Sequence, residues 1–329
     1  ALLRLLNTKE DLLPGAILYL RVYFLGMPAL ALFNFGNAIF SAIGETKKPL
    51  IYLSTAGVLN ILLNLFFVIV CQLNVVGVAL ASAISQCVSA ALILHALTKV
   101  EDCYALDFKA VKLDPAMTKS ILALGLPAGF QNAVFAIANL FIQAGVNSFD
   151  SLMVKGNSAA ANADGLIYDV MAAFHTACAS FIGQNYGAGN LKRVKNGMWV
   201  TLGMSVLYTL CTGALLLAFQ NPIMHLFTSD ETVVAFGCSA MHYFCPFYFL
   251  LATLHSMAGA VRGTGRSVPP MVVLLISLCL FRVVWIQFVL PFFAGIEGVF
   301  VLYPVSWALG AVLMALYAWK GNWMTYEHS

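Results

Sequence analysis

The sequence contains very little charge. Only 9% of its residues are Asp, Glu, Lys or Arg, whereas 61% are hydrophobic. A soluble globular domain usually has about 25% charged residues, so a chain this poor in charge is not expected to fold in water. The alternating ten-residue pattern of a membrane β-barrel is also absent. The remaining class is an all-α polytopic membrane protein.

Motifs for catalysis, metal binding and nucleotide binding are missing as well. The chain has no HExxH, no GxxxxGK[ST] and no nucleophile motif. Its 8 cysteines include no CxxC pair and lie mostly within apolar stretches, so we interpret them as small core residues. We therefore expect no enzyme activity, no resident cofactor and no metal site.

Long apolar stretches are what the sequence does have. Nine of them recur along its length, and each is long enough to cross a hydrocarbon core about 30 Å thick. The predicted spans are 17–43, 51–70, 76–97, 121–149, 159–182, 197–219, 240–260, 270–290 and 299–319.

Lysine and arginine are concentrated in alternate connections between these spans. The first connection carries Lys47 and Lys48, and the fifth, KRVK, is also basic, whereas the second connection, CQLN, has no cation. The positive-inside rule then places the basic connections and the C-terminus in the cytoplasm. We interpret the basic stretches as topology signals rather than as nucleic-acid contacts, so no nucleic-acid partner is expected.

An internal repeat relates the two ends of the chain. IGETKKPLIYL at 43–53 resembles TGRSVPPMVVL at 264–274, which places Gly44 over Gly265, and the same offset places Ser85 over Ser306. Spans one to three therefore repeat as spans seven to nine. Because both triplets have the same orientation, the pattern predicts a parallel repeat of six-helix halves.

The repeat also predicts a division of the chain. A second half that begins near residue 116 has a partner that would begin about 105 residues before residue 1. We therefore expect nine helices of a twelve-helix, two-lobe protein, that is, a fragment. Residues 1–98 would be the second half of the N-lobe, 99–120 a cytoplasmic linker and 121–329 the C-lobe.

Four segments carry a resemblance to a known family. They are YLRVYFLGMPALALFNFGNAIFSAIGETKKPL, VVGVALASAISQ, ILALGLPAGFQNAVF and FIGQNYGAGNLKRVKNG. In this order they resemble landmarks of the multidrug and toxic compound extrusion (MATE) family, especially its DinF-like bacterial branch, with this chain as helices four to twelve. The resemblance implies an antiporter, coupled to H⁺ or Na⁺, that exports organic, often cationic or amphipathic compounds by alternating access. It also implies a central cavity between two lobes and a multi-pass monomer among the lipids of the bacterial inner membrane.

The resemblance further implies a cation site. Archaeal and DinF-like members have an Asn and, four residues later, an Asp on one helix, and a Thr on the sixth helix; these fall on Asn60, Asn64 and Ser82. Asn64 departs from the pattern, because it is an amide where the family has a carboxylate. The i,i+4 spacing puts both amides on one helix face. The pair is therefore either a remnant of a cation site or a source of interhelical hydrogen bonds.

Other polar residues within the spans are candidates for a substrate cavity. Asn132, Asn139 and Gln143 form a stripe on the fourth span, with Gln131 beside it, and a polar helix face usually points at protein or a wet cavity. On the first span Asn34 and Asn37 could line the same cavity, although helix contacts are the simpler interpretation there.

Charged residues within the spans are few and are expensive without partners. Arg282 is expected to have a carbonyl or carboxylate partner. Asp164 and Asp169 are candidates for that pairing, or for binding a cation or a cationic substrate. We interpret His175, His242 and His255 as satisfied helix residues rather than proton carriers.

Two other function classes stay open. One is a flippase for lipid-linked sugars from the same superfamily, which would want several cations within the spans, whereas Arg282 is the only clear one. The other is a membrane enzyme or a non-transporting membrane fragment. The sequence names no particular substrate.

Overall fold

The protein is almost entirely helical where the structure describes it. The structure is a computed structural model that describes residues 13–146, 149–293, 295–320 and 323–324. These residues form helices and short connections and contain no strand. Among them, nine helices are long and apolar enough to cross a membrane. The prediction of an all-α polytopic membrane protein is confirmed.

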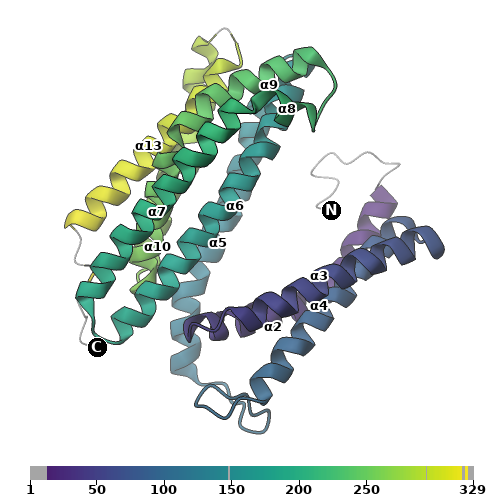
Figure 1. The fold of residues 1–329 in the computed structure, drawn as a ribbon, viewed down its shortest axis with the longest axis vertical. Coiled ribbons are helices and arrows are strands. Elements are labelled where there is room, and N and C mark those ends of the chain that lie inside the picture. Colours follow the sequence, from purple (N-terminus) through teal and green to yellow (C-terminus); the bar gives the residue numbers. More distant parts are fainter. Residues whose placement is uncertain (1–12, 147–148, 294, 321–322, 325–329) are drawn as a thin grey trace. The chain divides into compact units, whose positions relative to one another are not determined.

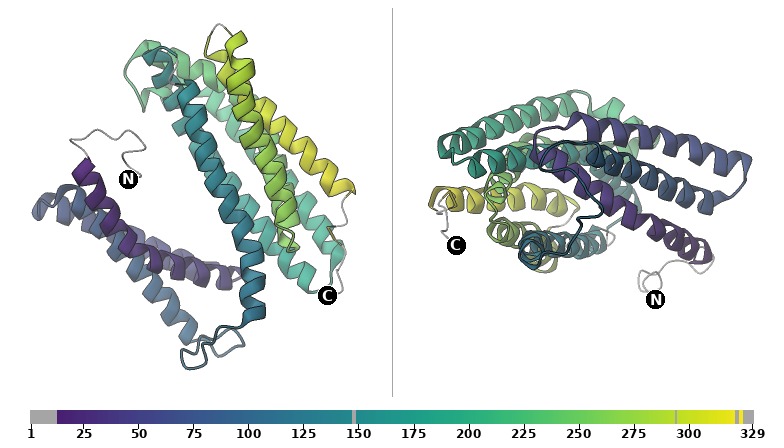
Figure 2. Two further views of the ribbon diagram at one scale, coloured as in Figure 1. Left: turned by 180° about the vertical axis from the view of Figure 1, so that it is seen from behind. Right: turned by 90° about the horizontal axis from the view of Figure 1, so that it is seen from below.

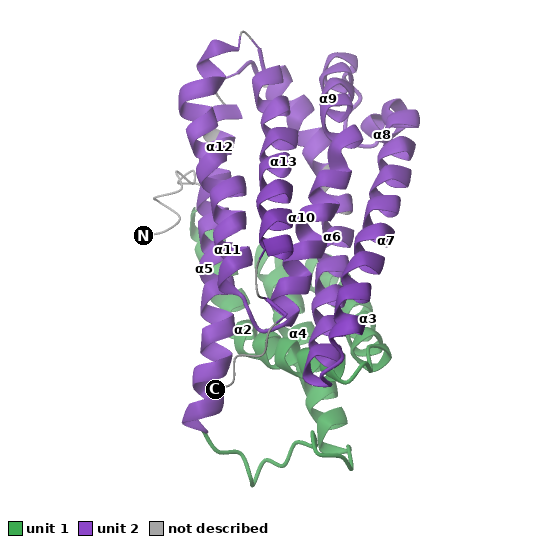
Figure 3. Cartoon of the chain, turned by 90° about the vertical axis from the view of Figure 1, so that its left-hand side faces the viewer, with its two compact units in different colours: residues 1–113 green, residues 114–329 purple. Residues whose placement is uncertain are grey.

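The chain divides into two compact units, residues 1–113 and 114–329 (Figure 3). The boundary falls within the stretch expected to link two lobes, but the assignment of the units to lobes of a transporter stays a prediction. Each unit is described by itself.

The described residues of unit 1 form three spans. They are α2 (Leu13–Ala42), α3 (Lys47–Leu65) with its π-helical extension η1 (Phe66–Val70), and α4 (Asn74–Thr98). α4 packs against both α2 and α3. α2 and α4 approach closely because α2 has glycine at the contact: a Cβ at Gly36 would lie 3.0 Å from the side chain of Ile93. Small residues permit such close packing of membrane helices.

Unit 2 has six spans. The unbroken ones are α5 (Pro115–Val146), α6 (Ser151–Gly187), α7 (Leu191–Ala218) and α13 (Glu297–Lys320). A short helix, α8 (Gln220–His225), follows α7. α6 and α7 begin eight and six residues before the predicted spans, because hydropathy detects only the hydrocarbon segment. Each of these two helices runs into the polar flank until a side chain caps it: Asp150 accepts from Leu152 N, and Asn190 accepts from Arg193 N.

The other two spans of unit 2 are interrupted. One comprises α9 (Glu231–Phe244), η2 (Cys245–Phe247) and α10 (Tyr248–Gly263), and Pro246 occupies its break. Proline has no N–H to donate to the preceding turn, so regular helix ends there. The other span comprises α11 (Val268–Leu274), η3 (Leu275–Leu280), α12 (Phe281–Val284), η4 (Trp285–Val289) and η5 (Leu290–Phe292).

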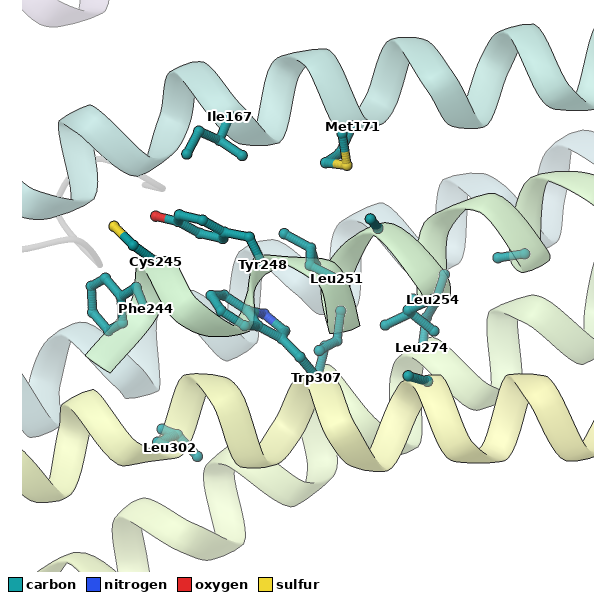
Figure 4. Packing of buried hydrophobic residues seen from close by; sticks show 14 of the residues in the cluster. Ile167, Met171, Phe244, Cys245, Tyr248, Leu251, Leu254, Leu274, Leu302 and Trp307 are labelled. Atoms are coloured by element: carbon teal, nitrogen blue, oxygen red, sulfur yellow. The ribbon is translucent and has the colours of Figure 1, made fainter. Parts of the chain in front are cut away.

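α10 lies at the centre of unit 2, where it packs against α6, α7 and α13 (Figure 1). Tyr248, Leu251 and Leu254 of α10 are almost fully buried between α6 and α13 (Figure 4). α5 packs against the interrupted span that contains η3 and α12 (Figure 2).

The repeat seen in the sequence recurs in local geometry. The repeat aligns Gly44 with Gly265, and these residues have φ of 83° and 86°. Each ends the first helix of its set with the same kind of bond: Gly44 N donates to Ser41 O, and Gly265 N donates to Arg262 O. The next helices begin at Lys47 and Val268, which align at the same offset. In both sets the third helix packs against the first and the second. Whether the sets are related by an axis along the membrane normal stays a prediction.

Candidate functional site

In unit 1, the two amides of α3 form a chain of hydrogen bonds with α4. Asn64 Nδ2 donates to Asn60 Oδ1 at 3.0 Å, and Asn60 Nδ2 donates to Ser85 Oγ at 3.2 Å. Ser85 Oγ in turn donates to the carbonyl of Ser82 at 2.9 Å. Both amides are half-buried and Ser85 is buried. The amides therefore do join two helices.

One atom of this chain is not used by the helix contact. Asn64 Oδ1 is buried and has no hydrogen-bond partner among the described residues. A buried acceptor without a partner costs about 1–3 kcal/mol, and a carbonyl oxygen is a ligand for a hard cation or an acceptor for a donor. Interhelical bonding explains Asn60 but leaves Asn64 Oδ1 unexplained.

Ser82 and Ser85 have different roles from those expected. Ser82 contributes its backbone carbonyl, while the hydroxyl that contacts the amide pair belongs to Ser85. Matching a family position predicted Ser82. The repeat could have indicated Ser85 instead, because the repeat aligns Ser85 with Ser306, which is the same residue type.

Unit 2 repeats this bonding pattern around Ser306. Arg282 Nε donates to Ser306 Oγ at 3.0 Å, and Ser306 Oγ donates to Tyr303 O at 2.8 Å. Ser306 and Tyr303 are the residues that the repeat aligns with Ser85 and Ser82. In each unit, a polar group of the second helix therefore donates to the same serine of the third helix.

Arg282 is buried and rests against an aromatic ring. Its guanidinium carbon lies 4.7 Å from the centroid of the Tyr303 ring, a contact that stabilises a desolvated cation. Of the two expected carboxylate partners, Asp169 is exposed on α6. Asp164 belongs to α6, but its side chain lies outside the described part of the chain. Pairing of Arg282 with Asp164 stays a prediction.

The polar residues of α5 do not act together. Gln131 is buried and its Oε1 accepts from Arg262 Nη2 at 2.9 Å, whereas Asn132, Asn139 and Gln143 are exposed. α5 turns Ala138 and Ile142 towards the protein. The stripe therefore faces away from the core of unit 2, as a cavity wall would.

Two hollows adjoin α5 on its other side. One of about 430 Å³ lies against η4 and η5 and includes Phe141 and Ile286. A groove of about 300 Å³ lies against η3 and α12. Neither is lined by the polar stripe.

In unit 1, Asn34 is exposed and Asn37 is half-buried on α2.

A second polar network crosses unit 2 between α5, α6 and α10. His175 Nδ1 lies 3.1 Å from the carbonyl of His255, and Arg262 Nη1 lies 3.4 Å from His175 Nε2. Arg262 also donates to Gln131. The sequence interpretation treated these histidines as satisfied separately and missed the network, because its members lie on three helices far apart in the chain.

Among the described residues, His225 lies outside the spans, on α8. The carbonyl of Asn221 and the carboxylate of Glu231, 3.2 Å from Nε2, raise the pKa of His225 above 6.5. His225 therefore keeps its charge to a higher pH than an isolated imidazole does.

The chain is similar in sequence to known proteins. The model of a family described as MatE matches residues 1–66 and 127–286. The chain is 31% identical to "Probable multidrug resistance protein YpnP" of Bacillus subtilis over 98% of this chain and 72% of that protein. It is 25% identical to "Probable multidrug resistance protein NorM" of Thermotoga maritima over 96% of this chain and 69% of that protein.

A solved structure has a similar fold. An outward-facing multidrug resistance MATE family transporter of the MOP superfamily superposes with a TM-score of 0.90 at 21% identity. The match covers 97% of this chain and 72% of that one. At this identity the likeness concerns the fold alone.

Proposed function

The chain belongs to the MatE family, and from this membership we propose that it works in the export of organic, often cationic or amphipathic compounds across a membrane. The observation that carries the proposal is the match over 98% of the chain to a relative named as a multidrug resistance protein. Family members are transporters rather than enzymes. Export would proceed by alternating access and would be driven by a gradient of H⁺ or Na⁺.

The amide pair of unit 1 supports the coupling part of this proposal. We take Asn60, Asn64 and Ser85 as the remains of a cation site, with Asn64 Oδ1 as the oxygen that is free to bind. An amide oxygen supplies a dipole rather than a full charge, so such a site would hold Na⁺ more weakly than a carboxylate would. The proposal does not require Asn64 to exchange protons.

The proposed location is the inner membrane of a bacterium, with the C-terminus in the cytoplasm and the protein a monomer among the lipids. The positively charged connections support this orientation, and the named relatives from Bacillus and Thermotoga support the bacterial setting.

An efflux assay tests the proposal. Cells that express the full-length protein should accumulate less ethidium than cells with an empty vector. A protonophore, or removal of Na⁺, should abolish the difference, because export needs a gradient. Equal accumulation with and without the protein, at verified membrane expression and across several lipophilic cations, would contradict the proposal.

A further inference from the structure

His175 lies at a close approach of two helices. A Cβ at Gly259 of α10 would lie 2.6 Å from His175 O, and one at Gly263 would lie 2.6 Å from Ala179 O. The glycines therefore bring the backbone of α10 against the backbone of α6. The side chain of His175 therefore starts from a residue whose backbone already contacts α10.

The hydrogen bonds determine the tautomer of His175. The carbonyl of His255 can only accept, so Nδ1, at 3.1 Å, carries the ring proton. A guanidinium can only donate, so Nε2, at 3.4 Å from Arg262 Nη1, is the acceptor. The ring is therefore neutral, and both of its nitrogens are used.

A second proton does not fit this arrangement. Protonation of Nε2 would set one N–H donor against another and one positive charge against the guanidinium of Arg262. From α10, the titratable and charged groups that face His175 are His255 and Arg262; α5 adds only the neutral Gln131. Tyr208 of α7 meets Phe174 instead, and no described carboxylate contacts His175 to neutralise an added charge.

Two nitrogen atoms of the network make no hydrogen bond to the described residues. His255 is 8% exposed, and its Nε2 is buried without a hydrogen-bond partner among the described residues. Nε of Arg262 is buried without a partner in the same way. Both atoms could form new bonds if Arg262 turned away from His175. A polar network confined to a structural role would more often be fully satisfied.

We propose that His175 is a proton-binding residue of the transporter and that its protonation separates Arg262 from His175 and loosens α10 from α6 and α5. A proton from water adds to Nε2, and only hydrogen bonds break. The inference rests on the proposed transport function for its biological meaning, and it names H⁺ as an ion that acts in unit 2. It revises the interpretation of His175 as a satisfied helix residue.

Nuclear magnetic resonance tests whether His175 binds the proton, and this test needs no transport assay. The full-length protein is labelled with ¹⁵N-histidine in liposomes, and His175→Gln assigns the His175 signals by their loss. At pH 8 the ring should be neutral with its proton on Nδ1, and on stepwise acidification it should become doubly protonated while the His255 signal shifts. A proton on Nε2 at pH 8, or a ring that stays neutral at every pH at which the protein remains folded, would overturn the inference.

A transport assay then tests the consequence. Glutamine can donate to the His255 carbonyl and accept from Arg262 but does not titrate, so His175→Gln should keep wild-type expression and melting temperature. Ethidium export by the wild type should change with pH by at most about tenfold per pH unit, which is the limit for one proton. In His175→Gln this pH dependence of export should be lost. His242→Gln is the matched control and should keep the pH dependence, since among the described residues His242 bonds within its own helix, to Cys238 O.

The two tests separate the possible failures. Unchanged pH dependence in His175→Gln would overturn the switch. If neither protein exports any compound, the proposed function fails, while the resonance measurement still decides whether His175 binds the proton.

Discussion

At the scale of residues, the amide pair of α3 shows how one side chain can serve two roles. Asn60 is fully explained by its bonds to Asn64 and Ser85. Asn64 uses its N–H for the same contact but keeps a buried oxygen without a partner in the described part of the chain. The distinction between helix contact and ion site therefore concerns the single atom Asn64 Oδ1.

Replacement of Asn64 by Asp in the full-length protein tests this atom. A carboxylate titrates whereas an amide does not, so Asn64→Asp should introduce or shift a pH dependence of ethidium export. The donor that is lost bonds to Asn60 of the same helix, so the bond from Asn60 to Ser85 that joins α3 to α4 should be kept.

Asn34→Asp is the control for this substitution, because it adds the same charge at an exposed position of α2. Identical pH profiles for wild type and Asn64→Asp, at equal expression, would leave Asn64 as a helix contact only.

At the scale of elements, glycine positions determine how closely the helices of unit 2 pack. Gly259→Ala should destabilise the protein, because its Cβ would lie 2.6 Å from His175 O and α10 would have to move. Overpacking of this kind typically costs about 1–3 kcal/mol. Thermal unfolding of the purified protein measures the change.

Gly203→Ala on α7 is the matched control. A Cβ there meets nothing within 4 Å, so the substitution should be neutral or stabilise the helix by about 0.5–1 kcal/mol. Equal melting temperatures for the two variants would show that the α6–α10 contact tolerates a methyl group.

The exposed stripe of α5 gives a second prediction for an element. If the stripe lines the path of the substrate, replacing Asn139 and Gln143 together with Leu should change which compounds are exported more than it changes protein level, because neutral polar contacts are lost. Replacement of exposed Ile137 and Leu140 of the same helix by Ala is the control. An unchanged export spectrum in the leucine variant would mean that the stripe contacts lipid or a neighbouring helix.

These elements show which features the sequence can predict. All nine spans were predictable, since hydropathy over about 20 residues is a strong local signal, and the repeat predicted the matching glycines Gly44 and Gly265. The extended ends of α6 and α7 were not, because capping by Asp150 and Asn190 lies outside the apolar windows. Contacts such as Asn60–Ser85 and His175–Arg262 depend on which faces of distant helices meet, and periodicity does not determine that.

At the scale of the whole molecule, the distribution of charge predicts an orientation. Lys47 and Lys48 are the first residues of α3, and Lys192, Arg193 and Lys195 lie at the start of α7. The connection between α8 and α9 contains Asp230 and no Lys or Arg, and α9 begins with Glu231. Basic connections are retained on the cytoplasmic side during insertion, so the connection between α8 and α9 should lie on the opposite side.

Reporter fusions to the full-length protein test this orientation. Green fluorescent protein fused after Ser329 should fluoresce, because it folds in the cytoplasm, and alkaline phosphatase at the same position should be inactive. Alkaline phosphatase inserted after Thr228, in the acidic connection, should be active, because it needs the oxidising side of the membrane to form disulfides. Insertion after Asn190, in the basic connection before α7, is the control and should be inactive. Activity after Asn190 together with inactivity after Thr228 would invert the topology and would place the basic residues outside.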